Sequence, residues 1–251
     1  MRYAVLQTDL KPLELELLRR AFRNVPGLTP YDANILGNDA YGVLVKNFSS
    51  EQAVALQGAL RAEGVETEIV EQSHLPELPP AKLVQRLDCQ PDHLLIFDPL
   101  GNNFPLEWRH IQLIAAGAVR LNDFVRYQKP RSVVRYNGSG QAVPEVEYDT
   151  VTREERNFHL LGEVVITGGA LRYSFSADRF NFAGLGERKT NSPPADFCLF
   201  IQDLIRFCPQ AALNQGAAAL NVQQPEIFTY PTKNAFHEEI VWRLWQMRKP
   251  A

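Results

Sequence analysis

The chain is poor in cysteine and has no long apolar run. Its 251 residues include only three cysteines, Cys89, Cys198 and Cys208. An odd and sparse count does not suit a secreted disulfide framework, and no four Cys and His residues are spaced like a zinc site. No apolar run approaches the roughly 20 residues that span a bilayer, and the opening residues lack the apolar segment of a signal peptide. We therefore expect a cytoplasmic protein without a membrane span.

An excess of charge of one sign is also missing. The formal net charge is −3, and Lys and Arg are scattered without a run of five or more. Proteins that wrap nucleic acid or lie on anionic lipid present a strongly basic surface. The slightly acidic net charge therefore argues against a nucleic-acid partner, including single-stranded nucleic acid bound through aromatic side chains. The share of hydrophobic residues, 45%, is ordinary for a globular protein with a packed core.

Motifs of catalysis are absent too. The glycines at 184–186 lack the spacing to a lysine that wraps backbone around a phosphate, and no nucleophile elbow or His-Glu-x-x-His pattern occurs. His110 beside Glu107 could act as a general base, but a polar cluster at a strand edge explains it better. His237 and Glu238 fit the exposed first turn of a helix, and a metal would need further ligands. We expect no enzyme, cofactor or metal.

What the chain does have is a strong pattern of strands and helices in its first 70 residues. Short apolar segments predict strands at 3–7, 41–46 and 65–70. Between them lie helical patterns, two before the second strand and one after it. The expected order is β-α-α-β-α-β. Several residues mark where these helices begin and end. The beginnings are marked by Pro12 early in the first helix, an N-cap at Thr29 and a capping box of Ser49 with Gln52, and the ends by Gly37 and Gly64.

The remainder is richer in strands. A proline-rich linker at 73–82 is expected to separate a first domain, 1–72, from a second, 83–251. Turn signals in the second domain separate six short strand candidates, at 93–98, 103–106, 111–121, 162–167, 171–176 and 179–182. The polar stretch 126–157, with a turn at 137–140, is a long loop or a mobile hairpin. Helices follow, one opened by Ser192 and one capped by Asn234. Strands followed by helices predict an α+β fold.

Residues 27–70 resemble the C-terminal domain of the bacterial ribosomal stalk protein. The positions that match that family are Gly27, Leu28, Ala33, Leu36, Ala40, Leu44, Ser49, Ala53, Leu56, Ala59, Leu60, Gly64, Glu66 and Glu68. The resemblance implies a module with an exposed helical face, which in the stalk family binds translation factors. Arg20 and Arg23 match basic positions of that face. Arg19, Tyr31 and Asn34 depart from it, because the family has an isoleucine and two lysines there.

The second domain is weakly similar to pleckstrin-homology-like barrels. The apolar segment 93–98, a strand ending in Trp108, the segment 110–121 and an amphipathic C-terminal helix at 234–248 carry this similarity. It implies a small barrel closed by a helix. Fold alone does not give function.

Aromatic residues are the main surplus of the second domain. Tyr173 and Phe175 share one face of a strand, and Phe180 and Phe182 share one face of the next. Both pairs suit a core. The alternative is a stacking platform or groove rimmed by arginines, namely Arg172, Arg179 and Arg188. For Trp242 and Trp245, on the last helix, the same two alternatives stay open: packing in the core or exposure at a binding surface.

The pattern favours a non-enzymatic binding or adaptor protein with a protein partner. Two surfaces are candidates for that partner: the helical face of Arg19, Arg20 and Arg23, and an aromatic surface of Tyr173, Phe180, Trp242 and Trp245. The alternative is a small-molecule or lipid-headgroup site in the second domain, which could be enzymatic.

Overall fold

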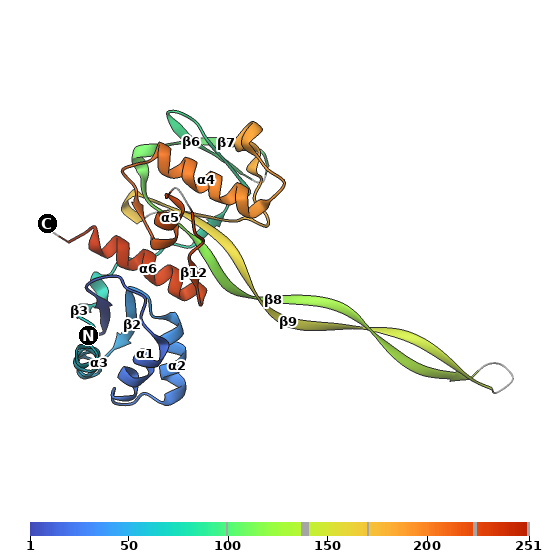
Figure 1. Ribbon diagram of the computed structural model, residues 1–251, viewed down its shortest axis with the longest axis horizontal. Helices are drawn as coiled ribbons and strands as arrows, with labels where there is room; N and C mark the ends of the chain where they lie inside the picture. The colour runs from blue at the N-terminus through green and yellow to red at the C-terminus, as the bar shows by residue number, and fades with distance from the viewer. Residues whose placement is uncertain (99, 137–140, 170, 223–224, 250–251) are drawn as a thin grey trace. The chain divides into compact units, whose positions relative to one another are not determined.

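The computed structural model of the protein describes residues 1–98, 100–136, 141–169, 171–222 and 225–249. The structure contains both helices and sheets, which is consistent with the predicted α+β fold (Figure 1). The chain divides into two compact units, one made of residues 1–119 with 159–251 and the other of residues 120–158. Each is described by itself.

The first 71 residues have the predicted order of elements. They are β1 (Tyr3–Gln7), α1 (Leu15–Arg23), α2 (Pro30–Asp39), β2 (Val43–Phe48), α3 (Ser50–Ala62) and β3 (Thr67–Glu71). The strands form a sheet of order β2-β1-β3, in which β1 runs antiparallel to both neighbours. A hydrophobic cluster that includes Leu18, Phe22, Leu56 and Leu60 fills the space between this sheet and the three helices.

The helix caps of this module are as predicted, and two other details differ. The side chains of Thr29 and Ser49 each accept a bond from the third residue of their helix, and Gly64 has a φ of 79°. Helix α1 begins at Leu15, so Pro12 precedes it. Helix α2 runs through Gly37, where a Cβ would lie 2.8 Å from Leu15 Cδ1. The glycine there permits close packing of α1 on α2 and does not end the helix.

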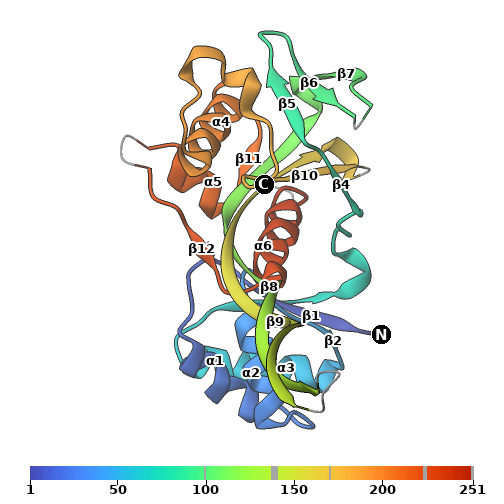
Figure 2. The same cartoon turned by 90° about the vertical axis from the view of Figure 1, so that its right-hand side faces the viewer.

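The C-terminal helix covers the other face of this sheet. Helix α6 (Lys233–Gln246) packs Val241 and Trp242 against the apolar side chains of all three strands, and Figures 1 and 2 both show it beside them. The indole N–H of Trp242 donates to the carbonyl of Gln7 at 2.7 Å. The segment predicted as a linker contributes Leu75 and Leu78 to the same cluster. After a 3-10 turn at Gln72–His74 it leads into a short strand. The first sheet is therefore buried on both faces.

The rest of the chain forms two further sheets. One has the antiparallel order β5 (Arg86–Cys89), β6 (His93–Phe97), β7 (Asn103–Glu107). The other has the order β11-β8-β9-β10-β4, with β12 also on β8. Its strands are β4 (Ala81–Leu83), β8 (Ile111–Tyr136), β9 (Ala142–Ile166), β10 (Arg172–Ser176), β11 (Ala212–Leu213) and β12 (Thr229–Tyr230). Over the residues described, neither sheet closes into a barrel, so the predicted pleckstrin-homology-like barrel is unconfirmed.

Helix α4 (Pro193–Phe207) and the short α5 (Gln215–Leu220) complete this part, together with 3-10 segments at Trp108–His110, Thr167–Gly169 and Phe182–Arg188. Helix α4 opens after Ser192, as predicted. Helix α6 is capped by Thr232, whose hydroxyl accepts from the Ala235 N–H, rather than by Asn234. None of the helices in the described ranges is long and apolar enough to cross a membrane.

The aromatic core of this part was predicted, but its strand 179–182 was wrong. The rings of Phe175, Phe180 and Phe200 lie 4.7–5.5 Å apart and are buried. Residues 177–179 make a turn, and the side chain of Asn181 accepts from the Ala183 N–H, which starts the 3-10 segment instead of a strand.

Residues 120–158 form a hairpin ribbon made by the outer parts of β8 and β9. Of the two alternatives for 126–157, loop or hairpin, the hairpin is the one observed. Strand β8 does not end near 121, as the turn signals suggested, but continues to Tyr136. The turn predicted at 137–140 lies outside the residues described.

Candidate functional site

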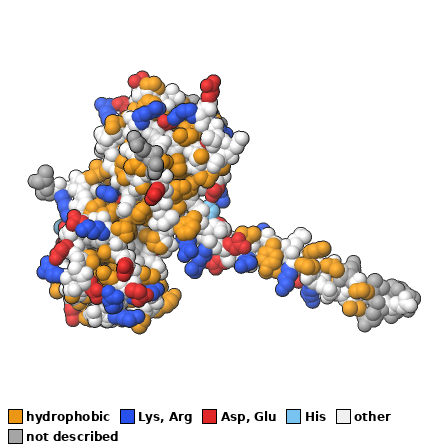
Figure 3. Space-filling model, in the orientation of Figure 1, with side chains coloured by type: hydrophobic (Ala, Val, Ile, Leu, Met, Phe, Trp, Pro, Cys, Tyr) orange, Lys and Arg blue, Asp and Glu red, His pale blue; other side chains and the backbone are white. Residues whose placement is uncertain are grey.

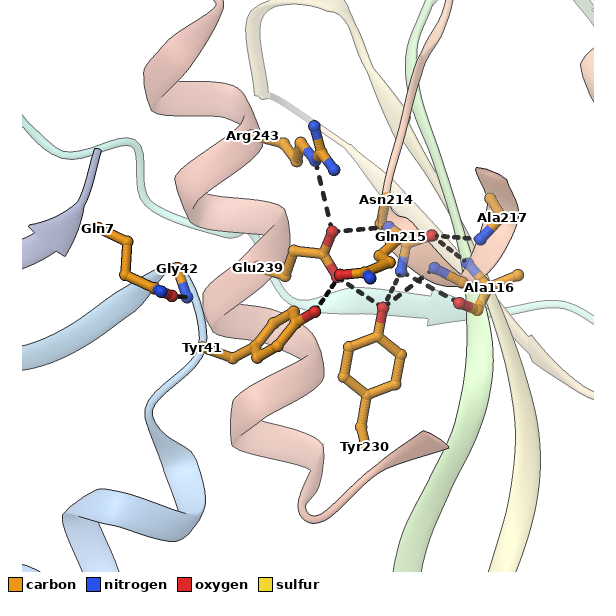
Figure 4. Close-up of polar contacts among 11 residues, drawn as sticks. Gln7, Tyr41, Gly42, Ala116, Asn214, Gln215, Ala217, Tyr230, Glu239 and Arg243 are labelled. Atoms are coloured by element: carbon orange, nitrogen blue, oxygen red, sulfur yellow. Dashed lines mark hydrogen bonds and ion pairs between the residues drawn. The ribbon is translucent and has the colours of Figure 1, made fainter. Parts of the chain in front are cut away.

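A buried carboxylate, Glu239 of α6, lies at the centre of a polar network (Figure 4). Its Oε2 accepts from the Tyr230 hydroxyl at 2.6 Å, and its Oε1 accepts from the Gln215 N–H at 2.6 Å. Arg243 Nε lies 3.4 Å from Oε1. Loss of hydration raises the pKa of Glu239, and that of Tyr230, because burial disfavours the charged form of each group.

The same network ties several elements to one another. Asn214 caps α5 and exchanges two bonds with the backbone of Ala116 in β8, at 2.9 and 3.1 Å. Its amide also donates to the Tyr230 hydroxyl at 2.8 Å. Tyr41, between α2 and β2, donates to the side chain of Gln215. Because Asn214, Tyr230 and Glu239 are wholly buried and bonded to protein, we interpret the network as a structural joint that a substrate does not reach.

A signal for this joint is present in the sequence, although the prediction did not include it. Glu239 stands between Phe236 and Ile240 in the apolar stripe of α6, so helical spacing puts it on the buried face. The exposed first turn that was expected for its neighbours His237 and Glu238 does not explain a carboxylate on that face.

A hollow of about 450 Å³ gathers charged side chains beside α6. Lys46 Nζ lies 2.8 and 2.6 Å from the two oxygens of Glu238. Glu163 is buried and accepts from Arg172 at 2.7 Å, and its other oxygen is 3.1 Å from His237 Nε2. Burial raises the pKa of Glu238, which the Lys46 charge partly offsets. The expectation that His237 is simply exposed is wrong, since its ring is paired and largely covered.

A second, larger hollow of about 730 Å³ contains two arginines that share one aspartate. Arg188 and Arg206 both form ion pairs with Asp203, and the Arg206 bond measures 3.1 Å. Burial raises the pKa of the Cys89 thiol nearby and raises that of Cys208 to about 11. Neither environment produces the thiolate that cysteine chemistry requires. No group of three or more His, Cys, Asp or Glu in the described part of the chain could hold a metal ion.

The predicted helical face of α1 carries arginines that are mostly paired. Arg19 pairs with Glu16, and Arg20 makes two bonds to Glu63, at 3.0 and 2.7 Å. Arg23 is exposed. These are the interactions of a solvated helix surface.

The predicted aromatic surface is not formed. Phe180 and Trp242 are 7% and 6% exposed, so both belong to the core and neither side chain is presented to a partner. Tyr173 and Trp245 are half-buried, and the Trp245 indole donates to Glu68 at 3.0 Å. Arg172, expected at the rim of a stacking platform, is instead buried against Glu163. Core packing therefore accounts for Phe180 and Trp242, and a buried ion pair accounts for Arg172.

Large exposed apolar side chains are concentrated on the hairpin ribbon instead. Phe124 is 72% exposed, and Val134, Val146, Tyr148 and Phe158 are each more than half exposed. Figure 3 shows hydrophobic side chains along the hairpin among basic and acidic ones. All five occupy even-numbered positions, and alternation along a strand places them on one face of the ribbon. Val125 and Tyr127, which are 41% and 44% exposed, lie at odd positions and so on the other face. We define the face of the five as the even face, and the opposite one as the odd face.

The odd face of the ribbon is held by polar pairs between the strands. Arg135 lies 2.6 Å from Glu147, Arg131 lies 4.0 Å from Asp149, and the Asn157 amide donates to Asp123 at 2.9 Å. The ribbon part of β8 is basic, with Arg120, Arg126, Lys129, Arg131 and Arg135 against a single Asp123. That of β9 is acidic, since it includes Glu147, Asp149, Glu154 and Glu155 against Arg153 and Arg156.

Comparison with known proteins does not identify a family for the chain. No protein-family model, no curated protein and no solved structure matches it significantly. Function must therefore be argued from the surfaces themselves.

Proposed function

We propose that this is a non-enzymatic, cytoplasmic binding protein that attaches to a protein partner through the even face of its hairpin ribbon. One observation carries the proposal. Five large apolar side chains line one face of a two-stranded ribbon and stand more than half exposed. Large apolar side chains left exposed on one surface are typical of a protein-binding site.

The energetics of the ribbon support this proposal. An isolated two-stranded hairpin is marginally stable in water, because it has no third strand or helix to cover its apolar side chains. Burial of apolar surface is worth roughly 25 cal/mol per Å². A partner that covered Phe124, Tyr148 and Phe158 would therefore stabilise the ribbon and gain affinity from the same contacts.

The surfaces suggested by sequence patterns are weaker candidates. The arginines of α1 are engaged with Glu16 and Glu63, which lessens their availability to a partner. Kinship with the ribosomal stalk module stays a proposal. Its support is the order β-α-α-β-α-β and the capping residues Thr29 and Ser49.

A matched pair of tyrosines tests the proposal. Tyr148 lies on the even face and Tyr127 on the odd face, and both are exposed. Affinity capture from native cytosol should recover the same partner with wild type and with Tyr127→Ser, and should lose it with Tyr148→Ser. A partner retained equally by both variants would contradict binding through the even face.

The hollow beside α6 supports a second candidate, a site for a small anion or a lipid headgroup. Its volume lies within the range of ligand sites, and Lys46, Arg172 and His237 line it beside Glu238 with its raised pKa. Titration calorimetry with inorganic phosphate should then give heat that Lys46→Met abolishes. The control is Lys82→Met, which removes an exposed lysine outside the hollow.

A further inference from the structure

We infer that the hollow of about 730 Å³ beside α4 is a binding site for a small amphipathic monocarboxylate, a molecule with one carboxylate and a short apolar chain. This inference goes beyond the proposed function and does not depend on it, because the residues that line the hollow all lie outside 120–158. It follows from three properties of the hollow: an excess of positive charge, the fixed position of that charge, and the apolar wall beside it.

The size of the hollow suits a small molecule. Helix α4, strand β11 and the residues just after α5 line it, together with Arg188 of the 3-10 segment that precedes α4. Sites for small ligands have volumes of roughly 300–1,000 Å³, and the hollow lies within this range.

The charged side chains of the hollow leave one positive charge in excess. Arg188 and Arg206 carry two positive charges, and both form ion pairs with the single carboxylate of Asp203. A guanidinium has five N–H donors. Arg188 directs two nitrogens at Asp203 and Arg206 directs one, and the two arginine side chains are 49% and 63% exposed, so further donors are open to a ligand. One excess charge matches one carboxylate, whereas a dianion would stay partly uncompensated.

Both guanidinium groups are held in position before a ligand arrives. Asp203 is 5% exposed and fixed within α4, and its carboxylate contacts both of them. The Arg206 guanidinium also lies over the ring of Phe207, 4.8 Å from its centre, and that ring is stacked on Trp108. Side chains that are already ordered lose less conformational entropy on binding. We therefore regard Asp203 as a positioning residue of the site.

An apolar wall lies beside the two arginines. Ile205, Pro209, Ala211, Leu213 and Val222 contribute to it. Val222 is 53% exposed, so apolar surface is open to solvent at this wall. A short apolar chain would cover the wall while its carboxylate binds the arginines, and each methylene that it buries adds to the affinity. An inorganic anion lacks this second contribution.

Titration calorimetry of the purified full chain with octanoate tests the inference. Octanoate should bind, and the affinity should rise from butyrate to octanoate by roughly threefold for each methylene that the wall covers. Octanamide keeps the apolar chain without the charge, so it should bind about tenfold or more weakly. Absence of octanoate binding, or equal affinity for octanoate and octanamide, overturns the inference.

A matched pair of arginines locates the site. Arg206→Met removes one guanidinium of the hollow and keeps an unbranched apolar side chain, and it should weaken octanoate binding by about tenfold or more. The control is Arg179→Met, which removes an exposed arginine outside the hollow and should leave the affinity unchanged. Circular dichroism of both variants verifies folding. Equal affinities in the two variants would show that octanoate does not use the arginines of the hollow.

A matched pair of valines tests the apolar wall. Val222→Asp places a negative charge where the apolar chain should lie, and it should weaken octanoate binding by about tenfold. Val54→Asp makes the same change at an exposed valine of α3, outside the hollow, and should have no effect. Because both valines are exposed, both variants should keep the fold. Octanoate binding that Val222→Asp leaves unchanged contradicts the assigned wall.

Two further outcomes separate this site from the other surfaces of the molecule. If Lys46→Met abolishes octanoate binding and Arg206→Met does not, the ligand lies in the hollow beside α6 and the inference is wrong. Tyr148→Ser should bind octanoate like wild type, since Tyr148 belongs to the ribbon. Failure of octanoate to bind therefore leaves the proposed function standing, and loss of the captured protein with Tyr148→Ser is judged separately.

Discussion

Two β-structures of this chain differ in the burial of their apolar side chains. In the sheet β2-β1-β3, the side chains of Ala4, Val5 and Leu6 are 0% exposed, because helices cover both faces. In the ribbon 120–158, side chains of the same chemical kind face solvent. The strands do not differ in β-propensity, since both contain Val, Tyr and Phe. What differs is whether helices pack on the strands. An apolar strand that no helix or sheet covers is available for binding.

The largest expected effect comes from removing the cover of the first sheet. Trp242→Ala deletes a buried indole from the cluster between α6 and the sheet, and it removes the hydrogen bond to Gln7. The free energy of unfolding should fall by about 3–5 kcal/mol. Urea denaturation followed by circular dichroism measures this, with Met247→Ala, an exposed residue of the same region, as the control. Equal losses in the two variants would contradict the packing described for α6.

A matched pair of valines compares the two structures directly. Val45 in β2 is buried and Val146 in β9 is mostly exposed. Val45→Ala should cost about 2 kcal/mol, whereas Val146→Ala should cost less than about 0.5 kcal/mol at a concentration where the chain is monomeric. The same denaturation measurement applies to both. A similar cost at both positions would mean that the ribbon is covered within the single chain.

The buried joint should respond to pH with a definite sign. Burial raises the pKa of Glu239 above its ordinary 4.5, so the native state holds this proton more tightly than the unfolded state. The resulting stabilisation is complete below pH 4.5 and is lost as pH rises through the native pKa. The stability of Glu239→Gln relative to wild type should therefore increase between about pH 4 and about pH 8.

Glu63→Gln provides the opposite sign as a control. The bonds from Arg20 lower the pKa of Glu63, so its contribution is present above its ordinary 4.5 and is lost as pH falls through the native pKa. That variant should lose stability relative to wild type as pH rises. The same trend in both variants would show that burial does not dominate at Glu239.

The smallest expected effect comes from removing the ribbon itself. Joining Asp123 to Asn157 through an Asn-Gly turn deletes residues 124–156. Because residues 120–158 form their own compact unit, the remaining unit should keep its fold and change in stability by less than about 1 kcal/mol. Thermal unfolding at a dilute, monomeric concentration checks this. A variant that fails to fold would show that the ribbon belongs to the core structure.

Local chemistry determined which parts of the fold were predictable. The first module was predicted in order because Thr29, Ser49 and Gly64 end or begin its helices by local bonds and backbone freedom. Gly37 was misjudged because a contact with Leu15, distant in sequence, decides its role. The strand expected at 179–182 failed for a local reason, since the cap made by Asn181 competes with the strand pattern.

The candidate sites were harder to predict because they depend on what covers each side chain. Trp242 and Phe180 have the composition of a binding surface, yet a sheet and a helix bury them. The ribbon residues Phe124 and Tyr148 lie in a polar stretch, and periodicity alone does not distinguish a strand that packs from one that stays open. Charge segregation between the two ribbon strands was readable from the sequence and was missed.

The bond between Trp242 and Gln7 joins residues 235 positions apart, and this has a consequence for how the chain folds during synthesis. The first module is synthesised before α6, so one side of its sheet stays open until α6 has been made. Contacts of such sequence separation form late, because closing a long loop has an entropic cost before the contact forms. The nascent protein should therefore expose an apolar surface between the synthesis of β3 and that of α6, and variants of α6 should aggregate at this stage.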